Sequence, residues 1–455
     1  MHVADIARVL GSELSVDAYC SGFSIDTRTL RPGQIFVAFK GANVDGHDYI
    51  AEAKNKGALA VIVERSTDVV IDQIRVISAM DALVTLAKYY RSCWTDVQVL
   101  ALTGSAGKTT TKEMLAAIMS EVGPVHATKA NNNNLLGLAI TILNKPKDVK
   151  RVVLELGINA PGEMAILADM ARPDVALITN IGSCHLEGLH NEETIAFEKS
   201  FLFAAVPADG IVLIDEASPF KSLFQKRACG KNIAYYSRNP GKANWYADVL
   251  EPDNAVCYRW RLYAANKPLG SIKLSIPGLF QVSNALCAAV MAQAVGVGVA
   301  AIASALESFV VPDFRFSSTR LSSGALLMED CYNANPYALQ AVLQCVRDMP
   351  QKQKCLVLGD MYELGDQAAY WYKVIAEKLR VAYGITHLYT VGDASRIMHA
   401  FYTGESAAHF HNHDGLLLAL TATAKKADLV ILMKGSRALA LDKVSRRLKE
   451  GVGVA

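Results

Sequence analysis

The sequence has no excess of charge of either sign. Its 455 residues include 46 Lys and Arg against 44 Asp and Glu, which gives a formal net charge of +2. It has no basic or acidic tail, so the electrostatic footprint of a nucleic-acid-binding protein is missing. The nine cysteines are scattered and none forms a C-x-x-C pair. This usage is typical of reduced, buried thiols in a cytoplasmic protein.

Signals for export or membrane insertion are also lacking. The N-terminal MHVADIARVLGSEL predicts a short amphipathic helix without the apolar core of a signal peptide. One apolar stretch of 18 residues, Leu286 to Ala303, is at the lower edge of the length that spans a bilayer. It contains Gln293 and is interrupted by Gly296 and Gly298. We interpret it as two buried helices joined at the glycines, and we expect no membrane insertion.

The pattern of apolar runs divides the chain into three regions. Residues 1–82 predict a small mixed α/β domain, in which the strands GQIFVAFKG and ALAVIVE accompany helices. In residues 83–312, runs such as RVVLELG and DVALITNIG alternate with helices, as in a parallel sheet covered on both faces. The alternation restarts in residues 313–455 with KCLVLGD, HLYTVGD and DLVILMKGS, which predicts a Rossmann-like second sheet. The expected fold class is therefore α/β with three domains.

A glycine-rich turn lies between a predicted strand, 97–102, and a predicted helix, 112–119, in the stretch VLALTGSAGKTTTKEML. The N–H groups at the start of a helix have no partner inside it, and the helix dipole favours an anion there. Gly104 and Gly107 let the backbone approach a phosphate closely, and Lys108 can reach the β- and γ-phosphates. The stretch therefore predicts a P-loop-type site for a nucleoside triphosphate.

The match is to a short form of the phosphate-binding loop, because the strict pattern has a glycine at the position of Leu102. In this form the hydroxyl of Thr109 is the expected ligand of Mg²⁺. The alternative is an ordinary strand–turn–helix with a solvated lysine. We prefer the phosphate site because the motif and its context agree.

Polar residues follow other strands of the same predicted sheet. Glu155 ends RVVLE and His185 follows LITNIGSC. A carboxylate and an imidazole beside a phosphate can hold a divalent cation, although a lone histidine after a strand is more often a loop or core residue. Lys199 lies on the next predicted helix, and the residues alone leave a solvated lysine open as the alternative. Four successive asparagines, 131–134, predict a loop that is either a plain turn or a binding element.

Together these motifs resemble the Mur ligase family of bacterial cell-wall synthesis. In the first region SIDTRTLRPGQIFVAFKGANVDGHDYI is similar to a uridine-nucleotide-binding segment of the family. In the second, TGSAGKTTTKE, ELGINAPGE and TNIGSCHLEG match its ATP and metal motifs. In the third, EDCYNANP, LGDMYELG and LMKGSR are close to signatures of the members that add D-alanyl-D-alanine.

The resemblance implies an ATP- and Mg²⁺-dependent ligase. Its substrates would be a UDP-N-acetylmuramoyl-tripeptide and D-alanyl-D-alanine, joined through an acyl phosphate, and we expect a monomer without nucleic-acid partners. The implied catalytic residues are Lys108, Glu155, His185, Lys199 and Arg315. The implied ATP-binding residues are Gly104, Ser105, Ala106, Gly107, Lys108, Thr109, Thr110, Asn284, Arg315 and Asn333. The implied metal ligands are Thr109, Glu155, His185 and Lys199, the last as a carbamate. The implied substrate-binding residues are Thr27, Arg28, Asp45, Gly46, His47, Thr128, Asn131, Asn133, Asn134, Lys434 and Arg437.

The chain departs from the family pattern at several positions. A family glycine is replaced by Ala130 in the asparagine loop, and another by Phe314 before Arg315. Phe280 and Gln281 stand where the family has His-Asn, and Phe201 and Tyr372 replace a glutamate and a histidine. Two alternatives therefore stay open: a folylpolyglutamate-type or other Mur-type ligase on the same scaffold, and a non-catalytic nucleotide-binding module.

Overall fold

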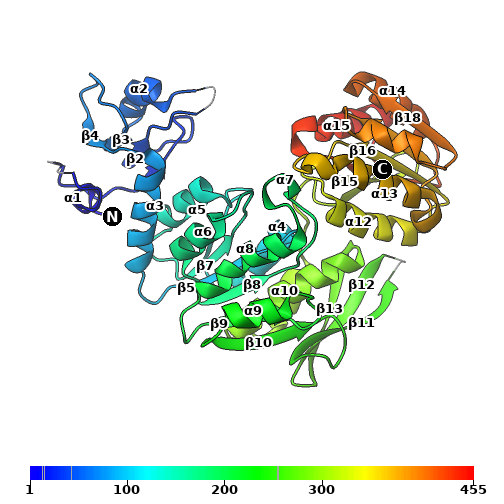
Figure 1. Ribbon diagram of the computed structural model, residues 1–455, viewed down its shortest axis with the longest axis horizontal. Coiled ribbons are helices and arrows are strands. Elements are labelled where there is room, and N and C mark those ends of the chain that lie inside the picture. The colour runs from blue at the N-terminus through cyan, green and yellow to red at the C-terminus, as the bar shows by residue number, and fades with distance from the viewer. Residues whose placement is uncertain (13, 15, 42–43, 254–255) are drawn as a thin grey trace.

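The computed structural model describes residues 1–12, 14, 16–41, 44–253 and 256–455. Three β-sheets organise it, and we call each sheet with its helices the first, central and third unit. Figure 1 shows the first unit in blue at one end, the third unit in orange and red at the other, and the central unit between them. The predicted α/β class is confirmed, while the domain boundaries after residues 82 and 312 stay predictions. Within the described ranges, no helix is both long and apolar enough to cross a bilayer.

The first unit has a four-stranded parallel sheet in the order β1-β2-β3-β4. Helix α2 packs with Phe36 and Val61 on one face of the sheet, while Ile35 and Ile62 on the other face belong to a core shared with the central unit. Its elements are β1 Gly22–Ser24, β2 Gln34–Val37, η1 Gly46–Tyr49, α2 Ile50–Asn55, β3 Ala60–Val63, β4 Asp72–Arg75, α1 Val3–Val9 and α3 Ala79–Ser92.

The central unit has a nine-stranded sheet in the order β13-β12-β11-β10-β9-β8-β5-β7-β6. Strands β5 to β11 all run parallel, as the buried apolar runs predict. Its strands are β5 Gln98–Thr103, β6 Val125–Ala127, β7 Arg151–Glu155, β8 Val175–Ile178, β9 Ile211–Asp215, β10 Asn232–Ser237, β11 Trp245–Asp253, β12 Cys257–Ala264 and β13 Lys267–Pro277. Its helices are α4 Lys108–Ser120, α5 Leu135–Leu143, α6 Glu163–Ala171, α7 Leu186–Leu189, α8 Glu192–Ala204, α9 Lys221–Arg227, α10 Leu279–Ala294 and α11 Val299–Glu307.

The central sheet is parallel as predicted except at one edge, where β11, β12 and β13 form an antiparallel ribbon that the sequence did not predict. These strands alternate instead of running continuously apolar: Trp260 and Leu262 are buried, while Arg259 and Arg261 are exposed. Alternation is the pattern of a strand with one solvated face. The interpretation of Leu286–Ala303 as two helices is correct, because α10 ends at Ala294 and α11 begins at Val299.

The third unit has a six-stranded sheet in the order β14-β15-β19-β16-β17-β18, parallel except for β14. This agrees with the predicted doubly wound sheet. Its strands are β14 Ser317–Arg320, β15 Leu326–Asp330, β16 Gln353–Gly359, β17 His387–Val391, β18 Ser406–Phe410 and β19 Leu429–Lys434. Its helices are α12 Pro336–Asp348, η2 Gly365–Gln367, α13 Ala368–Tyr383, η3 Ser395–Ala400, α14 His413–Thr423, η4 Arg437–Leu439 and α15 Leu441–Val452.

Candidate active site

The glycine-rich turn joins β5 to α4, as predicted. The helix begins at Lys108, four residues before the predicted start at Lys112, because Gly107 caps it with a left-handed φ of +75°. A Cβ on Gly107 would lie 2.2 Å from Oδ1 of Asn284, so the close approach of α10 requires a glycine. The first intrahelical bond runs from the N–H of Thr111 to the carbonyl of Gly107. The N–H groups of the first helical turn, Lys108 to Thr110, are therefore available for an anion, whereas those of Ser105 and Ala106 donate to Asn180.

Glu155, at the end of β7, lies fully buried beside the start of α4. Its Oε1 accepts hydrogen bonds from Oγ1 of Thr109 at 3.1 Å and from Nδ2 of Asn133 at 2.8 Å. Its Oε2 has no partner among the described residues. A buried carboxylate oxygen without a partner is costly unless a cation occupies its vicinity. Oxygen ligands and an adjacent phosphate site suit Mg²⁺, so Glu155 and Thr109 fit the predicted metal.

Lys199 lies on α8 and is fully buried, which corrects the alternative of a solvated lysine. Its Nζ has no hydrogen-bond partner in the described part of the chain. Burial, followed by the nearby charge of Lys108, lowers the pKa of Lys199 to about 7. A large part of its amine is therefore neutral at physiological pH, and a neutral amine is nucleophilic.

His185 begins α7 with a left-handed φ of +51°. Its Nδ1 lies 2.6 Å from Oε2 of Glu363 in the third unit. Burial lowers the pKa of His185, which favours the neutral imidazole that a metal requires, and the imidazole lowers the pKa of Glu363. Sequence reasoning missed the contact with Glu363. The ELG motif that contains this residue was the available signal.

The third unit supplies the opposite wall of the site. The guanidinium of Arg315 donates from Nη2 to Oγ1 of Thr109 at 3.1 Å and lies 3.7 Å from the ring centroid of Tyr332. Lys434 is buried and donates to Oδ2 of Asp330 at 2.5 Å and to the carbonyl of Asn333 at 2.9 Å. Residues far apart in sequence thus place cationic groups opposite the phosphate-binding turn. Asp330 and Tyr332 were not predicted.

These walls enclose a cavity of about 830 Å³ between the central and third units. It is lined by most of the residues predicted for ATP, metal and peptide: Ser105, Ala106, Gly107, Lys108, Thr109, Thr110, Asn131, Asn133, Asn134, Glu155, His185, Asn284, Arg315, Asn333 and Lys434. Four other predicted residues do not line it: Gly104, Thr128, Lys199 and Arg437.

Each of these four has another place. Lys199 is buried in α8, and Gly104 accepts a hydrogen bond at its carbonyl from Nζ of Lys108 at 2.8 Å. The hydroxyl of Thr128 accepts from the N–H of Glu155 at 3.0 Å, which holds that strand end in place. Arg437 pairs with Asp442 at 2.7 Å. Thr128 therefore supports the site without facing the cavity.

A second cavity, of about 950 Å³, lies between the first and central units. Basic side chains gather on its wall: Arg31 from the first unit, and Lys129, Lys145 and Lys147 from the central unit. Asn131 and Asn134 line both cavities, so the asparagine loop separates the two. The loop is therefore a binding-site element in position, and Asn134 also caps α5.

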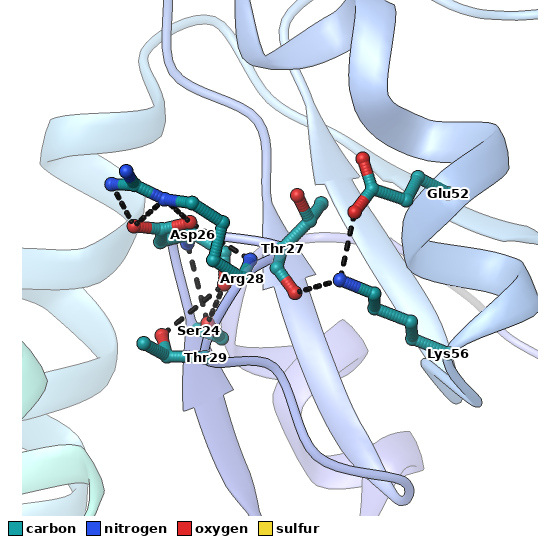
Figure 2. Close-up of polar contacts among 7 residues, drawn as sticks. All are labelled: Ser24, Asp26, Thr27, Arg28, Thr29, Glu52 and Lys56. Atoms are coloured by element: carbon teal, nitrogen blue, oxygen red, sulfur yellow. Dashed lines mark hydrogen bonds and ion pairs between the residues drawn. The ribbon is translucent and has the colours of Figure 1, made fainter.

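The five residues predicted for the uridine nucleotide do not line this second cavity. Figure 2 shows two of them in a polar cluster after β1: the guanidinium of Arg28 meets the carboxylate of Asp26, and the carbonyl of Thr27 accepts from Nζ of Lys56 at 2.9 Å. Arg28 is exposed and lowers the pKa of Asp26 through this hydrogen bond. The segment is thus ordered internally and presents its arginine to solvent.

The other three lie at η1, directly after Ala42 and Asn43, which are outside the described residues. Asp45 accepts from the N–H and the Nδ1 of His47, at 2.9 and 2.7 Å, and these contacts hold its pKa well below the usual range. A Cβ on Gly46 would lie 2.7 Å from the backbone nitrogen of Phe39. The Asp-Gly-His segment therefore builds a tight, charged turn.

The departures from the family pattern have visible physical consequences. Ala130 and Phe314, which replace family glycines, have left-handed φ values of +48° and +61°, so both hold a conformation that favours glycine. Gln281 accepts from Nδ2 of Asn284 at 2.9 Å. The hydroxyl of Tyr372 accepts from the N–H of Met361 at 2.6 Å in the core, and Phe201 packs beneath the guanidinium of Arg227.

Comparison with known proteins defines the class. Residues 20–91 match the model "Mur ligase family, catalytic domain", residues 102–292 the "Mur ligase middle domain", and residues 314–437 the "Mur ligase, glutamate ligase domain". The chain belongs to the Mur ligase family.

Named relatives indicate the branch of the family. The chain is 33% identical to the UDP-N-acetylmuramoyl-tripeptide--D-alanyl-D-alanine ligase of Escherichia coli strain K12, over 97% of this chain and 95% of that protein. A crystal structure of MurF from Acinetobacter baumannii superposes with a TM-score of 0.89 at 27% identity, covering 98% of both chains. MurF ligase from Thermotoga maritima, solved in complex with ADP, gives a TM-score of 0.83 at 27% identity over 95% of this chain and 97% of that one.

Proposed function

We propose that this protein joins D-alanyl-D-alanine to a UDP-N-acetylmuramoyl-tripeptide at the expense of ATP, in the synthesis of peptidoglycan precursors. The observation that carries the proposal is the cavity between the central and third units. There the turn at Lys108 and the orphaned oxygen of Glu155 face Arg315 and Lys434. The relatives named for this reaction cover nearly the whole chain.

The reaction needs an activated acid, because a carboxylate is a poor acylating agent at neutral pH. The γ-phosphoryl group of ATP passes to the terminal carboxylate of the tripeptide and leaves ADP. The amine of D-alanyl-D-alanine then attacks the acyl carbon, an amide bond forms, and inorganic phosphate and a proton are released. The demands on the protein are positioning and neutralisation of phosphate charge.

The chain's own residues meet these demands in the proposal. The N–H groups at the start of α4 and Nζ of Lys108 bind the phosphates, and Arg315 approaches from the third unit beside Thr109. Asn284, against the loop, and Asn333 complete the nucleotide site. Thr109 and Glu155 would hold Mg²⁺, which neutralises phosphate charge when bound.

Lys199 is proposed to carry a carbamate. Its neutral amine can add to CO₂ with loss of a proton, which converts the buried amine into an anionic carbamate with two oxygen atoms. Its unpartnered Nζ and its lowered pKa support this role. Together with neutral His185, the carbamate would provide a second cation site.

The UDP-linked substrate is proposed to lie in the cavity between the first and central units, whose basic wall suits a diphosphate. Thr27, Arg28, Asp45, Gly46 and His47 would meet the nucleotide from the first unit. The asparagine loop, with Asn131, Asn133 and Asn134, lies between the two cavities, and the peptide is proposed to run past it from one to the other. Arg437 and Lys434 would approach the incoming dipeptide.

We also propose a cytoplasmic enzyme that acts as a monomer, since one chain supplies every residue of the site.

Phosphate release tests this function. Purified protein is mixed with ATP, Mg²⁺, the UDP-linked tripeptide and D-alanyl-D-alanine, and each component is then omitted in turn. We expect release only when both acceptor substrates are present, and we expect Lys108→Ala to lower the rate by about 100-fold or more, because the phosphate loses its main cation. Release without either substrate, or none in well-folded protein, contradicts the ligase and favours a nucleotide-binding module.

A further inference from the structure

Arg315 lies in a strained segment between α11 and β14. The residues on both sides of it, Phe314 and Phe316, have left-handed φ values of +61° and +67°. Bulky L-residues rarely adopt this conformation, so the surrounding contacts must impose it. These two left-handed residues fix the direction in which the side chain of Arg315 extends from the backbone. That direction is toward Thr109, 3.1 Å from Nη2.

The rings of Phe314 and Phe316 contact different parts of the structure. Phe316 is 1% exposed, and its ring meets Phe280 edge-on with centroids 5.3 Å apart. Phe280 lies in the first turn of α10, and its ring folds over Gly278, where a Cβ would lie 2.5 Å from the ring. On the other side, the guanidinium of Arg437 lies 6.0 Å from the ring centroid of Phe314. The arginine is thus held between a contact to the central unit and a contact within the third.

The Phe280–Phe316 contact joins the central unit to the third. Edge-to-face aromatic contacts at this separation are attractive and directional. Both rings line the cavity beside Arg315. In the same arrangement Arg315 reaches Thr109 and lies on Tyr332.

We propose that Phe280 and Phe316 are positioning residues that hold Arg315 against the phosphate-binding turn. This rests on the proposed function for its effect on catalysis. A cation that is already in place loses little freedom when phosphate charge develops, so the contact raises turnover and leaves binding of the UDP-linked substrate unchanged.

The test is a cycle of variants measured by phosphate release. Phe280→Ala is expected to lower kcat about tenfold with an unchanged KM for the UDP-linked tripeptide. In the background of Arg315→Ala, the same substitution is expected to change kcat less than twofold, because there is no arginine left to position. Phe280→Tyr keeps the ring and is expected to restore most of the turnover. An equal loss of kcat with and without Arg315, or no loss at all, overturns the proposal.

A second cycle separates this inference from the function. Thermal midpoints of the nucleotide-free protein are compared for Phe280→Ala, Arg315→Ala and the double variant. The proposal expects midpoint shifts that are clearly non-additive, since the two residues are coupled in the free protein; additive shifts overturn it even if the enzyme is active. If wild-type protein releases no phosphate, the ligase proposal fails, while this cycle still decides the coupling.

A matched aromatic pair provides the control. Tyr389 and Phe410 make a similar edge-on contact, 5.5 Å between centroids, inside the third unit. Phe410→Ala is expected to lower the thermal midpoint and leave kcat unchanged. If it lowers kcat as much as Phe280→Ala does, the loss reflects general destabilisation, and the positioning role is wrong.

Discussion

Lys199 illustrates what a single residue contributes beyond its motif. On the sequence it stands in a helix of ordinary polar composition, so a solvated position was open. Only the packing of α8 against the central sheet removes it from water and leaves its Nζ without a partner. The residue therefore opposes folding through its burial, and in the proposed function it would act through its reactivity, as is common at active sites.

Replacing Lys199 by Met is expected to stabilise the protein in a pH-dependent way. The pKa of Lys199 is about 7 in the folded protein and near the ordinary lysine value of 10.5 when unfolded. Below pH 7 both states are protonated, and the buried charge destabilises the wild type in full. Between pH 7 and 10.5 the unfolded state binds more protons, so the unfolding free energy of the wild type rises with pH. The advantage of Lys199→Met is therefore largest at low pH.

The measurement is the unfolding free energy of both proteins in CO₂-free buffer. We expect their difference to narrow by about 2 kcal/mol between pH 7 and pH 9. Lys226→Met, on the exposed side of the neighbouring α9, is the control and should show no such trend. A constant difference across this range would mean that Lys199 keeps an ordinary pKa in its buried position.

At the scale of helices and strands, prediction from sequence was correct for strands that are buried on both faces along their length. The runs at β5, β7, β8 and β19 are apolar on both faces, so their burial could be predicted without their neighbours. The ribbon β11–β13 was missed because alternating strands do not reveal which sheet they join.

For the site, the phosphate-binding turn was predictable because its residues are contiguous. The contact of His185 with Glu363 was not, because it joins two units across 178 positions of sequence.

The junction between α5 and β1 depends on one asparagine. Asn144 caps the end of α5, and its side chain accepts from the N–H of Phe23 at 2.8 Å and donates to the carbonyl of Phe23 at 2.9 Å. A side-chain amide thus takes the place of a neighbouring strand at the edge of the first sheet. A Cβ on Gly22 would lie 2.2 Å from its Oδ1, so the approach requires glycine there.

Asn144→Ala is expected to loosen the first unit without altering the central one. Two buried backbone groups lose their partner, at about 1 kcal/mol each, so local opening of β1 should become about thirtyfold more frequent. Hydrogen exchange followed by mass spectrometry measures this in peptides that cover β1 and β2. Asn144→Asp keeps the acceptor and should give an intermediate effect. If hydrogen exchange in both variants equals that of the wild type, other contacts hold the sheet edge.

At the scale of the whole molecule, two cavities lie on either side of the asparagine loop, and we propose a different ligand for each. The larger faces the first unit and carries basic residues on its wall, and the other faces the third unit and contains the phosphate-binding turn. Neither sheet alone completes either site. In the proposed function, the chain order of first, central and third unit would place the nucleotide-linked acid and the activating nucleotide on opposite sides of this loop.

This division predicts that the two nucleotides stabilise the protein independently. A ligand that binds only the folded state at about 100 times its Kd adds about 2.7 kcal/mol to the unfolding free energy, so each should raise the thermal midpoint of the wild type. Lys108→Ala should lose the shift from a Mg²⁺-bound, non-hydrolysable ATP analogue and keep the shift from the UDP-linked tripeptide. Arg31→Ala, on the wall of the other cavity, should show the reverse pattern. Thermal shift assays with each ligand alone and with both provide the measurement. If either substitution weakens both shifts equally, the ligands share one site, and the assignment of one nucleotide to each cavity is wrong.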